Sequence, residues 1–218
     1  MDSRGIFVAL EGPEGSGKTT QAARLVDWLS ACGRPHLHVR EPGGLPVAEQ
    51  VRRILLERAH VPAVAELMLI LAARAALVEE RIAPALAEGA VVVADRFELS
   101  TFAYQIHGRG LPEDAVRRAN TLATGGLRPD LTLVLDVPAG VAEERRRDER
   151  RRPDRIESAG AAFHARVMEA YGLLATSEPD VELVDGSGAP DVVHERVVAR
   201  LRARFPETFR VGEGFNPA

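Results

Sequence analysis

The sequence predicts an α/β fold in which helices cover both faces of one parallel sheet of five strands. Short apolar runs alternate with longer amphipathic runs along the chain, and the apolar residues of the short runs are consecutive. Consecutive apolar residues are typical of strands buried on both faces of a parallel sheet. Alternation of strands and helices is typical of a doubly wound domain, which binds its ligands at the carboxyl ends of the strands.

The strands are predicted where the apolar runs occur, and the helices where apolar residues recur at helical spacing. The strands are residues 5–10, 35–40, 90–95, 130–136 and 181–185. The helices are residues 19–29, 47–56, 64–87, 113–123, 141–150, 161–176 and 191–204. A chain of 218 residues suits one domain, predicted over 1–204, and the segment 205–218, with two prolines and two glycines, is predicted as a surface tail.

Composition excludes several classes of function. The net charge is −4 with a pI near 5.9, so no overall positive field favours nucleic acid or an anionic membrane. Cys32 is the single cysteine, which excludes an internal disulfide framework and is typical of a reducing compartment. The sequence contains no apolar run of 18 residues. We therefore expect a cytoplasmic protein with neither a nucleic-acid nor a membrane partner.

A phosphate-binding loop follows the first predicted strand. Residues 12–19 match the pattern G-x-x-x-x-G-K-[ST], between an apolar strand and a helix. Its backbone N–H groups and the start of the helix favour phosphate, while Lys18 can reach the β and γ phosphates and Thr19 can bind Mg²⁺. Lys18 is also the only lysine beside 27 arginines. The expected ATP-binding residues are Gly12, Pro13, Glu14, Gly15, Ser16, Gly17, Lys18, Thr19 and Thr20.

The loop alone does not name the reaction, because GTPases, motor ATPases and small-molecule kinases share it. A GTPase normally carries an Asn-Lys-x-Asp motif, which is impossible where Lys18 is the only lysine. Motor ATPases usually need longer chains. Elimination therefore favours a kinase for a small acceptor.

A second metal-side residue is expected at the end of another strand. Two strands end in an acid, Asp95 and Asp136. Asp95 is favoured because Arg96 follows it, which would put a metal ligand beside a cation for phosphate. Asp136 is followed by Val-Pro and is more typical of a strand end or a helix cap.

Seven arginines lie within residues 145–155. A nucleic-acid patch is one interpretation, but acidic residues interrupt the cluster and no aromatic side chain is interleaved. A solvated helix face is the second. The third is a small mobile flap, about residues 145–157, which closes over the triphosphate and carries arginines to the transferred phosphoryl group.

Several separated motifs together resemble the bacterial thymidylate kinase family, over nearly the whole chain up to about Arg204. The motifs are the loop with its flanks (11–21), Arg-Glu-Pro-Gly-Gly (40–44), Ala-Ala-Arg (72–74), the block 95–105, Gly-Arg-Gly (108–110), Arg-Pro-Asp-Leu-Thr (128–132) and Pro-Asp-Arg-Ile-Glu (153–157). The resemblance implies a P-loop kinase fold with a five-stranded parallel sheet. It also implies a transferase of nucleotide biosynthesis that phosphorylates dTMP to dTDP with Mg·ATP, as a homodimer.

The resemblance also implies roles for individual residues. Glu14 approaches the acceptor sugar, Arg74 and Arg96 hold the acceptor phosphate, and Glu41 and Pro42 line the acceptor pocket. Thr101 and Gln105 contact the thymine edge, Tyr104 packs under the deoxyribose, and Ser100 belongs to the same motif. The implied catalytic residues are Lys18, Asp95 and Arg96, together with an arginine of the flap, for which Arg147, Arg150 and Arg151 are the candidates.

The chain departs from the family pattern at three positions. Ile70 stands where a phenylalanine usually stacks on thymine, Leu45 stands where threonine usually ends the acceptor turn, and Glu149 stands where arginine is common in the flap. With Ile70, thymine recognition is expected to depend more on Gln105 and Thr101. Two alternatives remain open: a kinase for another or modified deoxynucleoside monophosphate, and a nucleotide-binding regulator without turnover.

Overall fold

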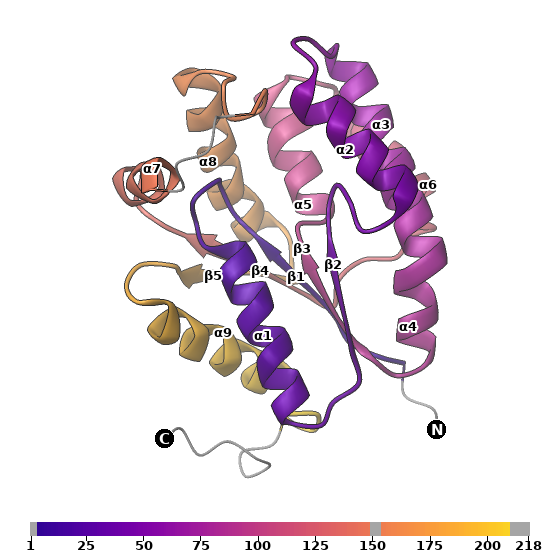
Figure 1. The fold of residues 1–218 in the computed structure, drawn as a ribbon, viewed down its shortest axis with the longest axis vertical. Coiled ribbons are helices and arrows are strands. Elements are labelled where there is room, and N and C mark those ends of the chain that lie inside the picture. The colour runs from indigo at the N-terminus through magenta and orange to yellow at the C-terminus, as the bar shows by residue number, and fades with distance from the viewer. Residues whose placement is uncertain (1–3, 149–153, 210–218) are drawn as a thin grey trace.

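A computed structural model of the chain describes residues 4–148 and 154–209, without the side chains of residues 146–148. The predicted sheet is confirmed: five parallel strands lie in the order β2-β3-β1-β4-β5, with helices on both faces (Figure 1). The strands are β1 (Phe7–Glu11), β2 (His36–Arg40), β3 (Val91–Asp95), β4 (Leu131–Asp136) and β5 (Val181–Asp185). Four of them begin one or two residues later than predicted, and β5 has the predicted bounds.

All seven predicted helical segments are helical where the structure describes them, with most ends shifted by one or two residues; residues 149 and 150 of the predicted segment 141–150 lie outside the described residues. The helices are α1 (Lys18–Ala31), α2 (Pro46–Glu57), α3 (Ala63–Leu77), η1 (Val78–Ile82), α4 (Ala83–Ala87), α5 (Glu98–Thr101), η2 (Phe102–Gly108), α6 (Glu113–Thr124), α7 (Ala139–Asp148), α8 (Ala161–Ser177) and α9 (Pro190–Arg204). None of these described helices is long and apolar enough to cross a bilayer.

Two helical regions differ from the prediction for identifiable reasons. The predicted helix 64–87 is α3, the π-helical segment η1 and α4 in succession, and the π-helical turn precedes Pro84, whose ring has no N–H to donate to the previous turn. The helix formed by α5 and η2 was missed. Nearly all of its side chains are buried, so it has no amphipathic pattern for a sequence to reveal.

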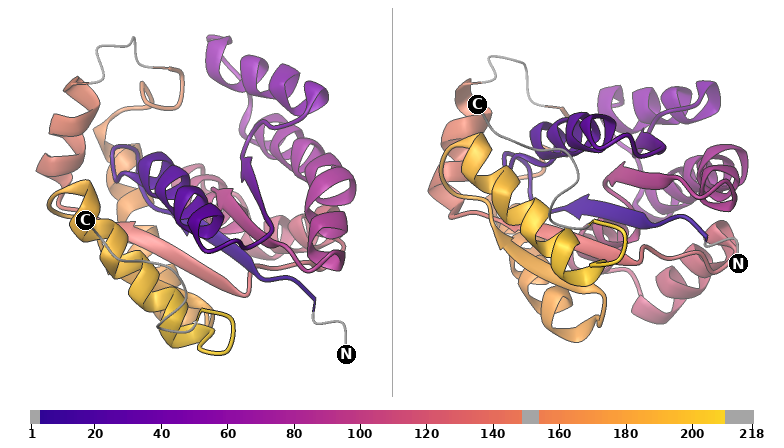
Figure 2. Two further views of the ribbon diagram at one scale, coloured as in Figure 1. Left: turned by 60° about the horizontal axis from the view of Figure 1, so that its bottom comes forward. Right: turned by 90° about the horizontal axis from the view of Figure 1, so that it is seen from below.

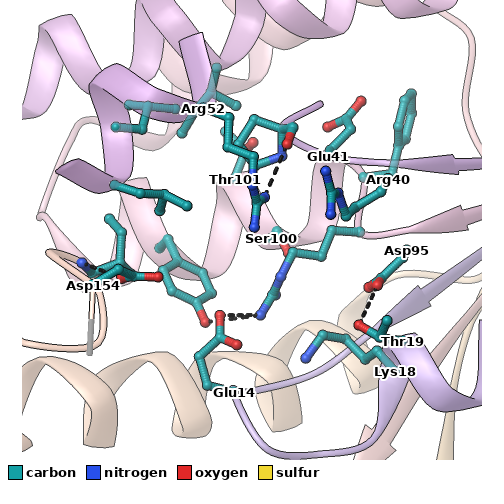
Figure 3. Close-up of a pocket in the computed structure, with 18 of the residues that line it drawn as sticks. Glu14, Lys18, Thr19, Arg40, Glu41, Arg52, Asp95, Ser100, Thr101 and Asp154 are labelled. Carbon is teal, nitrogen blue, oxygen red and sulfur yellow. Dashed lines mark hydrogen bonds and ion pairs between the residues drawn. The ribbon is translucent and has the colours of Figure 1, made fainter. Parts of the chain in front are cut away.

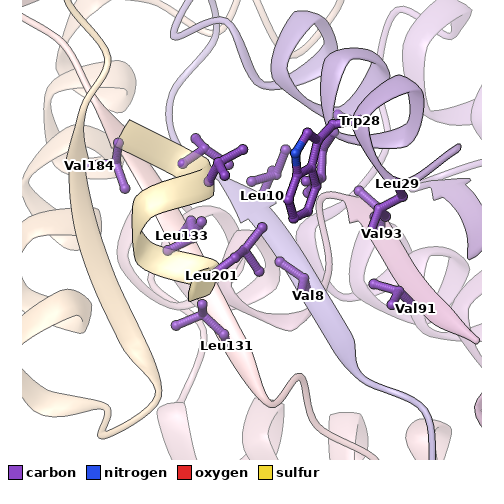
Figure 4. Packing of buried hydrophobic residues seen from close by; sticks show 14 of the residues in the cluster. Val8, Leu10, Trp28, Leu29, Val91, Val93, Leu131, Leu133, Val184 and Leu201 are labelled. Atoms are coloured by element: carbon purple, nitrogen blue, oxygen red, sulfur yellow. The ribbon is translucent and has the colours of Figure 1, made fainter. Parts of the chain in front are cut away.

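Alternate side chains of the three central strands, β3, β1 and β4, enter cores on opposite faces of the sheet. Val8 and Leu10 pack with Trp28 of α1 and Leu201 of α9 on one face (Figure 4). Phe7 and its same-face neighbours pack under α2, α3 and α4 on the opposite face. Figure 2 shows α1 and α9 side by side on the first face. Burial on both faces explains why the apolar residues of β1, β3 and β4 are nearly consecutive.

The register of the sheet determines where the functional loops meet. Leu10 of β1 and Arg40 of β2 are both paired with Asp95 of β3. The chain that leaves β1, β2 and β3 therefore starts from one row across the sheet, at the carboxyl ends of the strands. This edge is where a doubly wound sheet binds ligands.

The predicted tail begins later than expected. Phe209 is buried and its ring centroid lies 5.3 Å from that of Trp28, while Arg34 donates a hydrogen bond of 2.6 Å to the carbonyl of Thr208. Residues 205–209 therefore cover the core beside α1, which the sequence did not indicate because two aromatic residues form no periodic pattern. The rest of the predicted tail lies outside the described residues.

Replacing Phe209 with alanine should destabilise the fold. Loss of a buried aromatic side chain typically costs about 3 kcal/mol of the free energy of unfolding. Urea unfolding of Phe209→Ala measures this cost. The matched control is Leu173→Ala on α8, where the side chain is 53% exposed and a change below about 0.5 kcal/mol is expected. Equal stability of the two variants would contradict the packing of residues 205–209.

Candidate active site

A cavity of about 610 Å³ opens at the carboxyl ends of β1, β2 and β3 (Figure 3). Side chains from the loop after β1, from α2 and α3, and from the helix formed by α5 and η2 line it. Of the residues predicted from the sequence, the lining includes Glu14, Gly15, Gly17, Lys18, Thr19, Thr20, Glu41, Pro42, Ile70, Arg74, Asp95, Arg96, Ser100, Thr101, Tyr104 and Gln105. Segments widely separated in the sequence thus contribute to one site.

The loop between β1 and α1 has the geometry of a phosphate cradle. Gly12, Gly15 and Gly17 all have positive φ, at 135°, 79° and 95°. Space also demands glycine, since a Cβ on Gly15 would lie 2.3 Å from the carbonyl oxygen of Ala142. The helix α1 begins directly behind the loop at Lys18, and no side chain caps its first N–H groups. These groups and the positive end of the helix suit phosphate oxygens.

Lys18 is buried in the loop, and two oxygen atoms of the loop accept hydrogen bonds from its ammonium group. Its Nζ donates hydrogen bonds to the carbonyl of Pro13 (2.7 Å) and to Oγ of Ser16 (3.3 Å). Burial, together with the nearby charge of Arg96, lowers the pKa of Lys18 to about 8, against the opposing effect of neighbouring carboxylates. An anion that enters the cavity would restore the ordinary preference of this amine for the charged form.

The side chain of Thr19, at the start of α1, contacts the side chain of Asp95, at the end of β3. Oγ1 of Thr19 donates a 2.6 Å hydrogen bond to Oδ2 of Asp95. Asp136 is exposed at the end of β4 and does not line the cavity. Among the described residues no three acidic, histidine or cysteine side chains gather to hold a metal. The pair does fit Mg²⁺, which takes one or two protein oxygens and completes its shell with phosphate and water.

Arg96 projects into the centre of the site from strained backbone. Its φ is +75°, unusual for any residue except glycine, and its N–H donates to the carbonyl of Leu10 (3.0 Å). Nη2 donates to Oε1 of Glu14 (2.6 Å). Nη1 donates to the carbonyl of Gly12 (3.1 Å) and to Oγ of Ser100 (2.9 Å). Strain of this kind is typical of functional positions, where the surroundings hold one conformation.

Glu11 is a site residue to which the sequence analysis assigned no role. It is fully buried at the end of β1. Its carboxylate accepts hydrogen bonds from the backbone N–H groups of Phe97 (2.8 Å) and Ser100 (3.0 Å), the hydroxyl of Ser100 (2.6 Å) and the hydroxyl of Tyr171 (3.0 Å). Burial raises the pKa of Tyr171, which keeps that hydroxyl protonated as a donor. The sequence contains one signal for this role, which is a charged residue, Glu11, directly after an apolar strand.

Arg74 and Glu41 form a buried ion pair at the back of the cavity. The Nε and Nη2 atoms of Arg74 donate to Oε2 of Glu41 at 2.8 and 2.6 Å. Its remaining N–H groups donate to Thr101, Asn120 and the carbonyl of Phe97. All five donors of Arg74 are thus used. The predicted contact between Arg74 and an acceptor phosphate would have to replace one of these bonds.

The other carboxylate oxygen of Glu41 has no partner in the described chain. Burial raises the pKa of Glu41 above its usual value despite the opposing charge of Arg74. The ion pair connects the turn after β2, which includes Pro42, to α3.

The far wall of the cavity suits a flat, partly polar ring. Ile70 lines it from α3, and Tyr104 and Gln105 line it from η2. Nε2 of Gln105 donates a 2.8 Å hydrogen bond to Oε1 of Glu66. Leu45, the second departure from the family pattern, packs in the core with Ala48 and does not line the cavity. Of these two departures, only Ile70 therefore touches the site directly.

The arginine-rich segment is only partly described. Arg147 lies in α7, where its side chain is not described, and Arg150 and Arg151 lie outside the described residues. Arg145, which the sequence analysis did not single out, links the loop to the turn after β5. Its guanidinium donates to the carbonyls of Ser16 (3.3 Å) and Gly186 (3.1 Å).

Comparisons with known proteins agree on one family. A family model described as thymidylate kinase matches residues 10–197. A thymidylate kinase from Symbiobacterium thermophilum is 41% identical over 97% of this chain and 99% of its own length, and one from Geobacter sulfurreducens is 45% identical over 93% and 99%. The crystal structure of a thymidylate kinase from Ehrlichia chaffeensis superposes with a TM-score of 0.75, at 27% identity, over 91% of this chain and 99% of that one.

The pKa of Lys18 predicts how nucleotide binding should change with pH. The free protein loses the Lys18 charge as pH rises through 8, so the affinity for MgATP should fall about tenfold between pH 7 and 9. Calorimetric titration at several pH values measures this. Lys18→Arg keeps its charge across the range, so its affinity should not fall. Its turnover should still be lower by orders of magnitude, because a planar guanidinium does not fit a cradle built around an ammonium.

Two results would contradict this account of Lys18. One is wild-type affinity that stays constant from pH 7 to 9. The other is near-normal turnover of Lys18→Arg.

Proposed function

The chain belongs to the thymidylate kinase family and transfers the γ-phosphoryl group of ATP to dTMP, and we propose that this transfer takes place in the cavity described above. The observation that carries the placement is the meeting of Lys18, Thr19, Asp95 and Arg96 at one edge of the sheet. No comparison favours either alternative, a kinase for a different monophosphate or a regulator without turnover.

On the donor side, the loop holds the phosphates of ATP. The backbone N–H groups of the loop, except at Pro13, surround the phosphate oxygens, and the ammonium of Lys18 neutralises charge on the group being transferred. Thr19 and Asp95 would hold Mg²⁺, which would offset the negative charge of the phosphates during transfer. The 2.6 Å contact between the two side chains supports this role.

On the acceptor side, Arg96 binds the phosphate of dTMP. A guanidinium matches phosphate with two parallel hydrogen bonds. The acceptor phosphate then competes with Glu14 for Nη2 of Arg96, and Glu14 shifts toward the sugar. Because Nη1 also contacts the carbonyl of Gly12, Arg96 keeps the acceptor phosphate next to the donor loop. Phosphoryl transfer depends mainly on this kind of positioning and charge neutralisation.

The deoxyribose and thymine occupy the far wall. Tyr104 packs under the sugar, Thr101 and Gln105 bind the edge of the base, and Ile70 covers its face. Burial raises the pKa of Tyr104, so its hydroxyl stays protonated. Arg74 supports Thr101 through a 3.0 Å hydrogen bond to its hydroxyl. One of Arg147, Arg150 and Arg151 remains our prediction for the flap arginine that reaches the transferred group.

A homodimer is supported by the surface of α3. Its side chains are apolar nearly all round, which is typical of a helix covered on every side. Val64 is nevertheless 58% and Met68 50% exposed, one helical turn apart. Met68→Glu should therefore sediment as a monomer, whereas Leu173→Glu on α8, an equally exposed control, should not. A monomeric wild type would contradict the dimer.

Cytoplasmic location remains a prediction from the single cysteine and the family.

A substrate panel tests the proposed function. In a coupled assay with MgATP, the protein should use dTMP with a kcat/KM at least tenfold above that for dCMP, dAMP or dGMP. The function would be contradicted if dTMP were not phosphorylated, or if dCMP, dAMP or dGMP were used with a higher kcat/KM than dTMP.

The variant Arg96→Lys tests the proposed site separately. It keeps the charge but loses the paired hydrogen bonds, so kcat/KM for dTMP should fall about 100-fold, with ATP affinity changed less than about threefold. Full activity of Arg96→Lys would show that the acceptor phosphate binds elsewhere in the cavity. It would not contradict the proposed function.

A further inference from the structure

A further buried carboxylate, Glu66 of α3, joins three distant segments at the base pocket. It is 0% exposed. Its Oε1 accepts from Nε2 of Gln105 (2.8 Å) and Nε of Arg109 (3.0 Å). Its Oε2 accepts from Nη2 of Arg109 (3.0 Å) and Nη2 of Arg155 (2.6 Å). Gln105, Arg109 and Arg155 belong to the motifs named above, but the reaction does not account for their convergence on Glu66.

Glu66 is ionised in this surrounding. Burial by itself would raise its pKa, but the hydrogen bonds from Arg109, Arg155 and Gln105 outweigh that effect and hold the pKa of Glu66 below its usual value. An ionised carboxylate has no proton to donate, so each neighbour must donate to it.

This requirement fixes the orientation of the Gln105 amide. A glutamine amide can turn about its last bond and exchange its donor and acceptor ends. Next to an acceptor-only carboxylate, only the Nε2 end is favourable, because the opposite orientation places two oxygens against each other. The carbonyl Oε1 accepts no hydrogen bond elsewhere in the described chain, and Gln105 lines the cavity.

We propose that Glu66 is the positioning residue that makes base recognition selective for thymine over cytosine. With Nε2 held by Glu66, Gln105 presents an acceptor, Oε1, followed by the second N–H of Nε2 as a donor. Thymine offers the complement, a donor at N3 and an acceptor at O4. Cytosine offers the reverse, an acceptor at N3 and a donor at N4.

Discrimination follows from the cost of unpaired groups. A site built to hydrogen-bond one pattern rejects the reversed pattern strongly, because polar atoms on both sides are then buried without partners. An amide that was free to turn would serve both bases. The inference rests on the proposed placement of thymine against Gln105.

The test compares two ligands that differ only at this edge, dTMP and 5-methyl-dCMP. Competition titration gives the dissociation constant of each. Wild type should prefer dTMP by about 100-fold or more. In Glu66→Gln the new amide can also donate, so Gln105 can turn and the preference should fall at least tenfold.

The matched control is Glu178→Gln. Glu178 also holds two arginines, Arg117 and Arg128, at 2.9 and 2.8 Å, but does not line the cavity. Its loss should lower stability while the preference stays within twofold of wild type. A structural role for Glu66 alone would weaken both ligands equally, and that result would overturn the proposal.

Two further variants keep the test decisive. If Glu66→Gln does not fold, the double variant Glu66→Gln/Arg109→Gln restores the local charge balance and is compared with Arg109→Gln alone. Gln105→Leu tests the placement of the base. If Gln105→Leu keeps the wild-type preference, the placement is wrong. If it loses the preference while the Glu66 variants keep it, only the inference about Glu66 is wrong.

Discussion

The carboxylate of Glu11 is buried at the end of the central strand, and four donors converge on it. Two are backbone N–H groups at the start of the helix after β3, and one is a hydroxyl from α8. A buried charge is tolerated only where its hydrogen bonds are satisfied in this way. Glu11 therefore fixes the acceptor half of the site to the strand that carries the phosphate loop. The strained backbone of Arg96 lies between the end of β3 and the N–H group of Phe97, which is bound to Glu11.

The cavity is lined by cations and carboxylates that contact one another, and a phosphate that binds there would pair with the cations. Lys18 and Arg96 face Glu11, Glu14 and Asp95 in the ligand-free protein. In the proposed reaction each carboxylate has a different role: Glu11 stays buried, Glu14 would release Arg96 to the acceptor phosphate, and Asp95 would hold a metal together with Thr19. In the proposed reaction Glu14 moves when the acceptor binds, whereas Glu11 keeps the backbone around Arg96 in place.

The sequence revealed features that are local and missed those that depend on distant contacts. The phosphate loop is contiguous, and the choice of Asp95 over Asp136 needed only the neighbouring Arg96. The roles of Glu11 and Glu66 could not be predicted, because every residue that donates a hydrogen bond to them lies 39 or more positions further along the chain. The helix of α5 and η2 is buried on all sides and shows no period, and Phe209 reaches the core from a segment without regular structure. Motif resemblance placed Arg74 on the acceptor phosphate, but it could not show that all five donors of Arg74 are already engaged.

Glu11 positions Arg96 and Ser100 against the phosphate loop. Single-turnover measurement of phosphoryl transfer in Glu11→Gln tests this role most directly, since the variant keeps the size of the side chain and removes its charge. We expect the transfer rate constant at saturating substrates to fall at least about tenfold, while the dissociation constants of ATP and dTMP change less than about threefold. An unchanged transfer rate constant in a correctly folded Glu11→Gln protein would contradict it.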